Sequence, residues 1–343
     1  MSHENTFDPE MKSAERLSRI EILAERFNQT TQLAAIAAFE KSGLGNKIEA
    51  DQAAVDAMRN DLNLMNMRLV IEVGEGIKDE APMLYIGEKV GRGDGLEYSG
   101  AVDPVEGTTA TANLKPDAVS VLAISERGGI LRLPPELIYM DKLITGPRSK
   151  DYVDINAPVT KNLDAIAKSL GKKVSDLRIK VLDRPRNEEL INEIRKSGAK
   201  VASIDYGDLM PGIASCIQGY DIHAVMGIGG APEAVLAAAG VLCLNGGIQV
   251  KPWTDKEATN KILDEKGFNM NKVFTAKQLV PGKLIIFSST GVTSGEMLNG
   301  VRTFVGGIRT YSLILSATNG FSSIRFIDKT IVTDVDQIEF RRH

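Results

Sequence analysis

The chain has 343 residues, of which 43% are hydrophobic and 25% charged, enough for one or two domains with a substantial buried core. The net charge of −4 and the pI near 5.6, without a long basic stretch, exclude typical nucleic-acid-binding and membrane-surface proteins. No apolar run is long enough to cross a bilayer. We therefore expect a small-molecule partner, and neither a nucleic acid nor a membrane.

The cysteines and histidines limit the possible chemistry. Cys216 and Cys243 lie in apolar segments without metal-site spacing, so we expect buried thiols in a reducing cytoplasm. The polar amino terminus lacks the apolar core of a signal peptide. Because His3 and His343 lie at the chain ends, we expect any metal to be held by oxygen, as Mg²⁺ or Mn²⁺.

Two helices are predicted at the start of the chain. Apolar residues recur with a helical period from Ser13 to Ser42, and Gly43 ends the pattern. A second helix is predicted to begin at residues 50–52. Asp51 occupies an N-cap position there, so its carboxylate can either cap the helix or serve as a ligand.

Three acidic residues follow predicted strands on glycine-bearing turns. The strand at 68–73 leads into Gly74-Glu75-Gly76, a second leads into Asp103, and a third, at 224–229, leads toward Glu233. In open α/β sheets, ligands bind at the carboxyl ends of strands. The first hypothesis is therefore a divalent-cation site that handles phosphate. The alternative at each position is a surface turn or a helix cap.

Most of the evidence for this hypothesis comes from the segment from Asp103 to Thr108. Pro104 is expected to end the strand, so that Asp103 and Glu106 can point into one pocket across a turn. Two carboxylates about 4 Å apart repel by roughly 4 kcal/mol at an effective dielectric constant near 20, which a shared proton or a bound cation must relieve. The Gly-Thr-Thr sequence that follows adds backbone N–H groups and hydroxyls suited to phosphate and a positioned water.

The second half is predicted to form β-α-β units after a proline-broken stretch at 146–161. Arg184 and Arg186 flank a proline after a strand at 177–183, which favours bidentate anion binding or forms a solvated basic turn. The glycines at 227–230 are similar to a dinucleotide fingerprint, but Pro232 occupies its third glycine position. The predicted division is 1–145, a linker at 146–161, 162–330 and a polar tail at 331–343.

Taken together, Gly-Glu-Gly at 74–76, Asp-Pro-Val-Glu-Gly-Thr at 103–108 and Gly-Ala-Pro-Glu at 230–233 resemble motifs of the class II fructose-1,6-bisphosphatases. This group includes cyanobacterial-type enzymes that also accept sedoheptulose-1,7-bisphosphate. The resemblance covers nearly the whole chain. It implies an α/β fold, specifically the layered α/β/α/β/α sandwich of the lithium-sensitive sugar phosphatase superfamily. It also implies hydrolysis of the 1-phosphate of a ketose bisphosphate with Mg²⁺ or Mn²⁺, in gluconeogenesis or the Calvin cycle.

The resemblance further implies roles for individual residues. The first subdomain would hold the metals, and the second would bind the sugar phosphate and supply Glu233. Thr108 would orient the attacking water, with support from the carboxylate of Asp79. The implied metal ligands are Asp51, Glu75, Asp103, Glu106 and Glu233. The implied substrate contacts are Lys47, Tyr139, Arg184 and Arg186 for phosphate, and Asp208 for sugar hydroxyls.

Three positions, Ile48, Ile77 and Tyr206, depart from the family pattern and bring substrate preference into question more than catalysis. Three other functions remain open. They are a related phosphatase of inositol or sugar monophosphates, a dinucleotide-binding protein, and a catalytically inactive sugar-phosphate sensor. The glycine-rich carboxyl-terminal strands can also support a homo-oligomer, a dimer or a tetramer.

Overall fold

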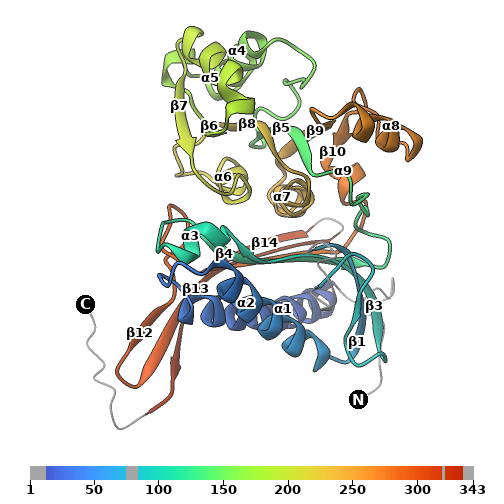
Figure 1. The fold of residues 1–343 in the computed structure, drawn as a ribbon, viewed down its shortest axis with the longest axis vertical. Helices are drawn as coiled ribbons and strands as arrows, with labels where there is room; N and C mark the ends of the chain where they lie inside the picture. Colours follow the sequence, from blue (N-terminus) through green and yellow to red (C-terminus); the bar gives the residue numbers. More distant parts are fainter. Residues whose placement is uncertain (1–12, 75–83, 319–320, 335–343) are drawn as a thin grey trace.

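The computed structural model describes residues 13–74, 84–318 and 321–334. Within these ranges the chain forms two mixed sheets and several helices, so the fold class is α/β. Figure 1 shows the sheets stacked, with helices between them and on their outer faces. Two predicted site residues, Glu75 and Asp79, lie outside the described residues.

The first sheet has eight strands and combines the two ends of the described chain. Its order is β12-β13-β11-β4-β3-β1-β2, with β14 paired to β13, and β1 runs parallel to β3. The strands are β1 Met67–Val73, β2 Lys89–Val90, β3 Leu96–Glu106, β4 Val119–Glu126, β11 Ile285–Gly291, β12 Arg302–Phe304, β13 Gly307–Thr318 and β14 Phe321–Val332. The predicted subdomain boundaries stay predictions, but strand pairing places β11, β12, β13 and β14 in the same sheet as the amino-terminal strands.

Two long helices cover one face of this sheet (Figure 1). They are α1 (Ser13–Glu40) and α2 (Lys47–Asn63). Their buried apolar side chains, including Phe27 and Met58, pack on strand residues such as Ile71 in one core cluster. Apolar residues at helical spacing lie along one side of a helix, and that side packs on the sheet. The periodicity predicted from the sequence therefore matches the side of each helix that is buried.

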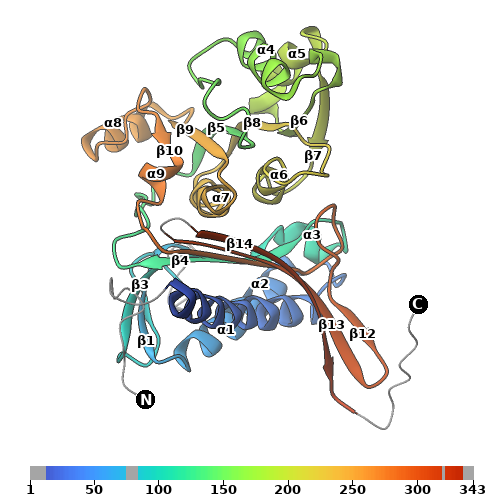
Figure 2. The same cartoon turned by 180° about the vertical axis from the view of Figure 1, so that it is seen from behind.

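The second sheet has six strands and lies above the first in Figures 1 and 2, in the order β10-β9-β5-β8-β6-β7. Helices α4 and α5 cover its outer face. Its strands are β5 Tyr139–Thr145, β6 Arg178–Leu182, β7 Lys200–Ile204, β8 Ala224–Gly230, β9 Gly247–Trp253 and β10 Phe274–Thr275. The remaining α-helices are α3 Thr108–Ala112, α4 Val159–Leu170, α5 Glu188–Lys196, α6 Leu209–Ala214, α7 Ala231–Cys243, α8 Glu257–Glu265 and α9 Ala276–Leu279.

The helix α7 lies between the two sheets, next to α6 (Figures 1 and 2). Most of its residues are buried, among them Ala234, Ala237 and Val241. It packs against β11 of the first sheet and β9 of the second, which explains a helix that is apolar on nearly all sides. The first turn of α7 consequently lies beside the end of β3 in the first sheet and the start of β5 in the second.

Several sequence predictions at element level are confirmed, and the strand predicted at 200–204 coincides with β7. The N-cap prediction for Asp51 is wrong. Asn46 caps α2 instead, because its side chain accepts hydrogen bonds from the N–H groups of Ile48 and Glu49. Asp51 therefore lies inside the helix, one turn beyond its start. No helix in the described ranges combines the length and apolar character needed to span a membrane.

Candidate functional site

Asp103 and Glu106 share one side of β3 because the strand contains a bulge. Opposite β4, Asp103 pairs with Val121 and Glu106 with Val119, so three steps along β3 match two along β4. Side chains alternate along a regular strand, so residues i and i+3 face opposite ways unless one extra residue is inserted. Pro104 lacks an N–H group and fits such a bulge. The prediction that Pro104 ends the strand is therefore wrong, because β3 continues to Glu106.

Carboxylates from several elements gather around Glu106. Its side chain is buried, and loss of hydration together with the charges of Glu233, Asp103 and Asp208 holds its pKa well above the usual range. Its Oε2 atom has no hydrogen-bond partner among the described residues. Burial also raises the pKa of Glu233, and the charge of Asp208 adds to that effect. Negative charge is thus concentrated where β3, α6 and α7 meet.

Lys142 on β5 is the buried cation of this cluster. Its Nζ atom donates a hydrogen bond of 2.7 Å to Oδ1 of Asp208, and both side chains are buried. The charge of Lys142 lowers the pKa of Glu106 and of Glu233, against the effect of burial. Strand β8 passes so close that a Cβ at Gly229 would lie 2.9 Å from Nζ and would overlap the Asp208 carboxylate. A side chain at this position would therefore have to displace the carboxylate of Asp208.

Arg186 borders the carboxylate cluster. Its guanidinium carbon lies 4.3 Å from the centroid of the Tyr139 ring, and its Nε donates to the carbonyl of Ile228 at 3.2 Å. Its positive charge also lowers the pKa of Glu233. Two predicted phosphate contacts, Arg186 and Tyr139, are thus in contact with each other beside the acidic groups.

Arg184 lies next to Tyr206, one of the three departures from the family pattern. Its guanidinium carbon is 5.9 Å from the centroid of the Tyr206 ring, and it donates to the carbonyl of Asp205 at 2.6 Å. The Nζ atom of Lys115 lies 5.5 Å from the same centroid. Both separations are within the range of cation–π attraction. The neutral ring of Tyr206 adds no negative charge beside these two cations.

Three further predicted residues lie on helices beside the bulge. Gly107, with a φ of 88°, turns the chain from β3 into α3, whose first residue is Thr108. Helix α2 packs against α3 and β3, and a hydrogen bond from Gly45 N–H to the carbonyl of Ala112 holds the preceding loop to the end of α3. Lys47 is the first residue of α2 and is exposed, whereas Asp51 is half-buried.

The comparisons with known proteins identify the family of this chain. Residues 21–331 match the family model described as bacterial fructose-1,6-bisphosphatase, glpX-encoded. The chain belongs to this family. A "D-fructose 1,6-bisphosphatase class 2/sedoheptulose 1,7-bisphosphatase" from Synechococcus sp. (strain JA-2-3B'a(2-13)) is 42% identical over 334 residues, covering 90% of this chain and 95% of that protein.

Two further relatives carry the same name. The protein from Synechococcus sp. (strain JA-3-3Ab) is 41% identical, with 90% of this chain and 95% of the relative covered. The protein from Microcystis aeruginosa (strain NIES-843 / IAM M-2473) is 40% identical, with 89% and 95% covered. The family predicted from the motifs is therefore confirmed.

Phosphatases of this family generally need divalent metal ions, and the described donor set fits such ions. No three described His, Cys, Asp or Glu side chains are already arranged as a ligand set. However, the unpartnered Oε2 of Glu106 and the mutual repulsion around it are what a cation would relieve. All of these donors are carboxylate oxygens, which suit Mg²⁺ and Mn²⁺. Two predicted members of the site, Glu75 and Asp79, lie beyond what the structure describes.

The glycines of β8 serve a purpose other than dinucleotide binding. An added Cβ at Gly229 would meet Asp208, and one at Gly230 would meet the carboxylate of Glu233. These glycines leave space for acidic side chains, which removes the argument for a dinucleotide there. Lys142 was not predicted as a site residue, although a lysine within the mostly apolar strand at 139–145 was a usable signal.

Proposed function

We propose that this chain is a metal-dependent phosphatase that removes the 1-phosphate of fructose-1,6-bisphosphate, forming fructose-6-phosphate and phosphate. We also propose sedoheptulose-1,7-bisphosphate as a second substrate, because the relatives' names include it. The observation that carries the proposal is the acidic cluster around Glu106, bordered by Arg186, in a chain of this family.

The proposed roles divide between chemistry and binding. When bound, Mg²⁺ or Mn²⁺ would activate a water and neutralise phosphoryl oxygens. Thr108 would orient that water, with help from Asp79. Phosphate monoesters hydrolyse so slowly that the barrier must fall by an amount toward the top of the ~8–23 kcal/mol range. A set of several carboxylates is suited to holding that much cationic charge. The proposed ligands are Asp51, Glu75, Asp103, Glu106 and Glu233.

Substrate binding would use the basic residues beside the cluster. Arg184 and Arg186 would hold the distal phosphate, so that binding energy is gained away from the bond that breaks. Lys47 and Tyr139 would add phosphate contacts. Asp208, fixed by its ion pair with a buried lysine, would accept hydrogen bonds from sugar hydroxyls.

Two finer points belong to the same proposal. We propose that the fold is the α/β/α/β/α sandwich of the lithium-sensitive sugar phosphatase superfamily. The order of layers supports this, with α1 and α2, the first sheet, α6 and α7, the second sheet, and then α4 and α5 (Figure 1). We also propose a cytoplasmic homo-oligomer, a dimer or a tetramer. Two free thiols, Cys216 and Cys243, are compatible with a reducing compartment.

The test is phosphate release by the purified chain from four compounds with Mg²⁺, Mn²⁺ or EDTA. They are fructose-1,6-bisphosphate, sedoheptulose-1,7-bisphosphate, fructose-6-phosphate and inositol-1-phosphate. We expect metal-dependent release of one phosphate from the bisphosphates, and Asp103→Asn as the control should reduce it to background. Turnover of inositol-1-phosphate alone would assign a different substrate. No release from any compound would favour a non-catalytic sensor.

A further inference from the structure

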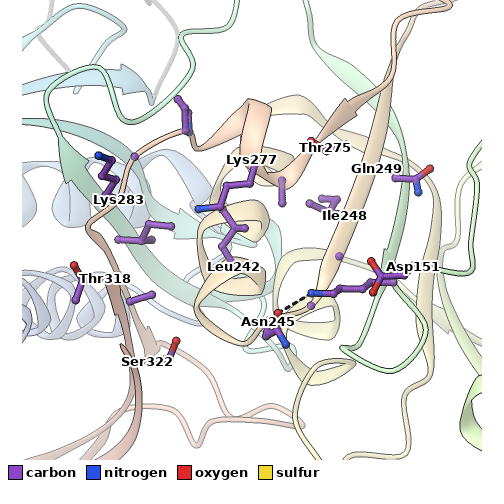
Figure 3. A pocket seen from close by; sticks show the side chains of 18 of the residues that line it. Asp151, Leu242, Asn245, Ile248, Gln249, Thr275, Lys277, Lys283, Thr318 and Ser322 are labelled. Carbon is purple, nitrogen blue, oxygen red and sulfur yellow. Dashed lines mark hydrogen bonds between the residues drawn. The ribbon is translucent and has the colours of Figure 1, made fainter. Parts of the chain in front are cut away.

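A cavity of about 700 Å³ lies between the two sheets, away from the acidic cluster. Its walls come from the loop after β5, the end of α7, the start of β9, α9, the segment leading into β11, the end of β13 and the start of β14. Figure 3 shows Leu242, Asn245, Lys277, Lys283 and Thr318 around one open space. No role assigned above uses this cavity.

Two elements separate the cavity from the proposed catalytic site. Strand β5 begins with Tyr139 beside the acidic cluster and reaches the cavity at Leu143. At roughly 3.3 Å per residue, these two residues lie about 13 Å apart along the strand. Likewise, α7 carries Glu233 in its first turn and contributes Leu242 to the cavity wall near its last turn. The cavity lining therefore includes none of the residues Asp103, Glu106, Lys142, Asp208 and Glu233 of the acidic cluster.

The charged side chains around the cavity are mostly basic. Lys150, Lys277 and Lys283 line it, with Asp151 as the acidic residue among the described lining groups. Lys150 donates a hydrogen bond of 2.6 Å to the side-chain oxygen of Asn245, a neutral partner (dashed line in Figure 3). Within the described ranges, none of the three ammonium groups forms an ion pair. The cavity therefore has positive charge available for an anion.

The remaining lining groups indicate the chemistry of that anion. Hydroxyls of Thr318 and Ser322 can donate to anionic oxygens, whereas Leu242 and Ile248 form an apolar wall. Lysine ammonium groups are common phosphate ligands. The volume falls within the ~300–1,000 Å³ of small-molecule sites and exceeds what a bare phosphate would fill. The geometry points to a second binding site for an organic phosphate, held by its phosphate at the lysines and by its carbon portion at the apolar wall.

The test uses phenyl phosphate, which combines a phosphate with an apolar ring, titrated calorimetrically into the full chain in EDTA. Arg186→Ala serves as the background, because it weakens binding at the proposed catalytic site. In this background we expect saturable binding. Adding Lys277→Ala and Lys283→Ala should weaken that binding at least about tenfold, because both ammonium groups proposed to hold the phosphate are removed.

The matched control removes two other exposed lysines, Lys256→Ala and Lys261→Ala, which lie outside the cavity. This pair should leave the affinity within about twofold. Equal weakening by both pairs would show an effect of net charge and overturn the site. Absence of binding in the Arg186→Ala background would also overturn it. If the cavity lysines instead changed the oligomeric state in sedimentation, the cavity would belong to an interface between copies. Because binding is measured, the outcome does not depend on the proposed activity.

Discussion

At the scale of single residues, the main feature is unbalanced charge at Glu106. This carboxyl group is buried, and three other carboxylates raise its pKa, whereas Lys142 alone among the causes lowers it. A buried carboxylate without compensation costs several kcal/mol, so the folded protein favours either the protonated form or a bound cation. We therefore expect this charge cluster to lower the stability of the metal-free protein.

Glu106→Gln should stabilise the metal-free protein at pH 8 by about 1 kcal/mol or more, because it removes a charge that burial disfavours. The pKa of Glu106 is raised in the folded state, so its ionisation opposes folding as the pH rises from the unfolded pKa, about 4.3, toward the folded value. The gain should consequently disappear near pH 4. Thermal unfolding in EDTA at both pH values measures it. Glu257→Gln, at an exposed carboxylate, is the control, and a loss of stability at pH 8 would contradict the argument.

Lys142→Met should destabilise the protein by about 3–5 kcal/mol, because it leaves Asp208 buried without its ion-pair partner. In the double variant Lys142→Met/Asp208→Asn, much of that loss should be recovered, since no lone charge remains. Urea unfolding of the wild type, both single variants and the double variant gives the coupling free energy. If the two single effects simply add, Lys142 does not act through Asp208.

At the scale of elements, the site depends on a bulge in one strand and a glycine in another. The bulge in β3 puts Asp103 and Glu106 on one face, and a Cβ at Gly229 of β8 would overlap the carboxylate of Asp208. A regular β3 would direct one of the two acids away from the cluster. Local backbone geometry therefore decides which of the acidic side chains can act together.

Gly229→Ala should destabilise the protein by about 1–3 kcal/mol and displace the Asp208 carboxylate, because the new methyl group would overlap it. If Asp208 binds the sugar, the KM for fructose-1,6-bisphosphate should rise more than kcat falls. Steady-state kinetics and urea unfolding measure both effects. Gly212→Ala is the comparison, since its Cβ would meet only the flexible end of Ile144, at 2.8 Å. Equal kinetic effects in the two variants would remove Asp208 from substrate binding.

At the scale of the whole molecule, the acidic cluster draws on both sheets. Asp103 and Glu106 belong to β3 of the first sheet, Lys142 belongs to β5 of the second, and Glu233 lies on the helix between them. A cation held by these acids would therefore join the two layers. Ligand binding to the folded state alone stabilises it by mass action.

We expect Mn²⁺ or Mg²⁺ to raise the melting temperature of the wild type. The free energy of unfolding should increase by about 2.7 kcal/mol at a metal concentration one hundred times Kd. EDTA should reverse the increase. Glu106→Gln should reduce the metal-induced shift, although its metal-free form is the more stable. Differential scanning calorimetry at constant ionic strength, with KCl as the control salt, makes the comparison. An unchanged shift in Glu106→Gln would remove that residue from the metal site.

Much of this protein follows from its sequence alone. The family, the acidic motifs and elements such as β7 were predictable, because they depend on the order of neighbouring residues and on hydrophobic period. The turn from β3 into α3 was predictable for the same reason, since Gly107 adopts the positive φ that glycine accepts most readily.

Tertiary structure alone decided three other features. Lys142 and Asp208 are 66 positions apart, and their buried ion pair leaves no local pattern. Strands β11–β14 return to the first sheet through pairing with β4, which no nearby residue specifies. The cavity with Lys150, Lys277 and Lys283 combines segments from distant parts of the chain. Sequence patterns report which face of an element is apolar. Which elements meet is decided by packing across the whole chain, where contacts depend on position in space.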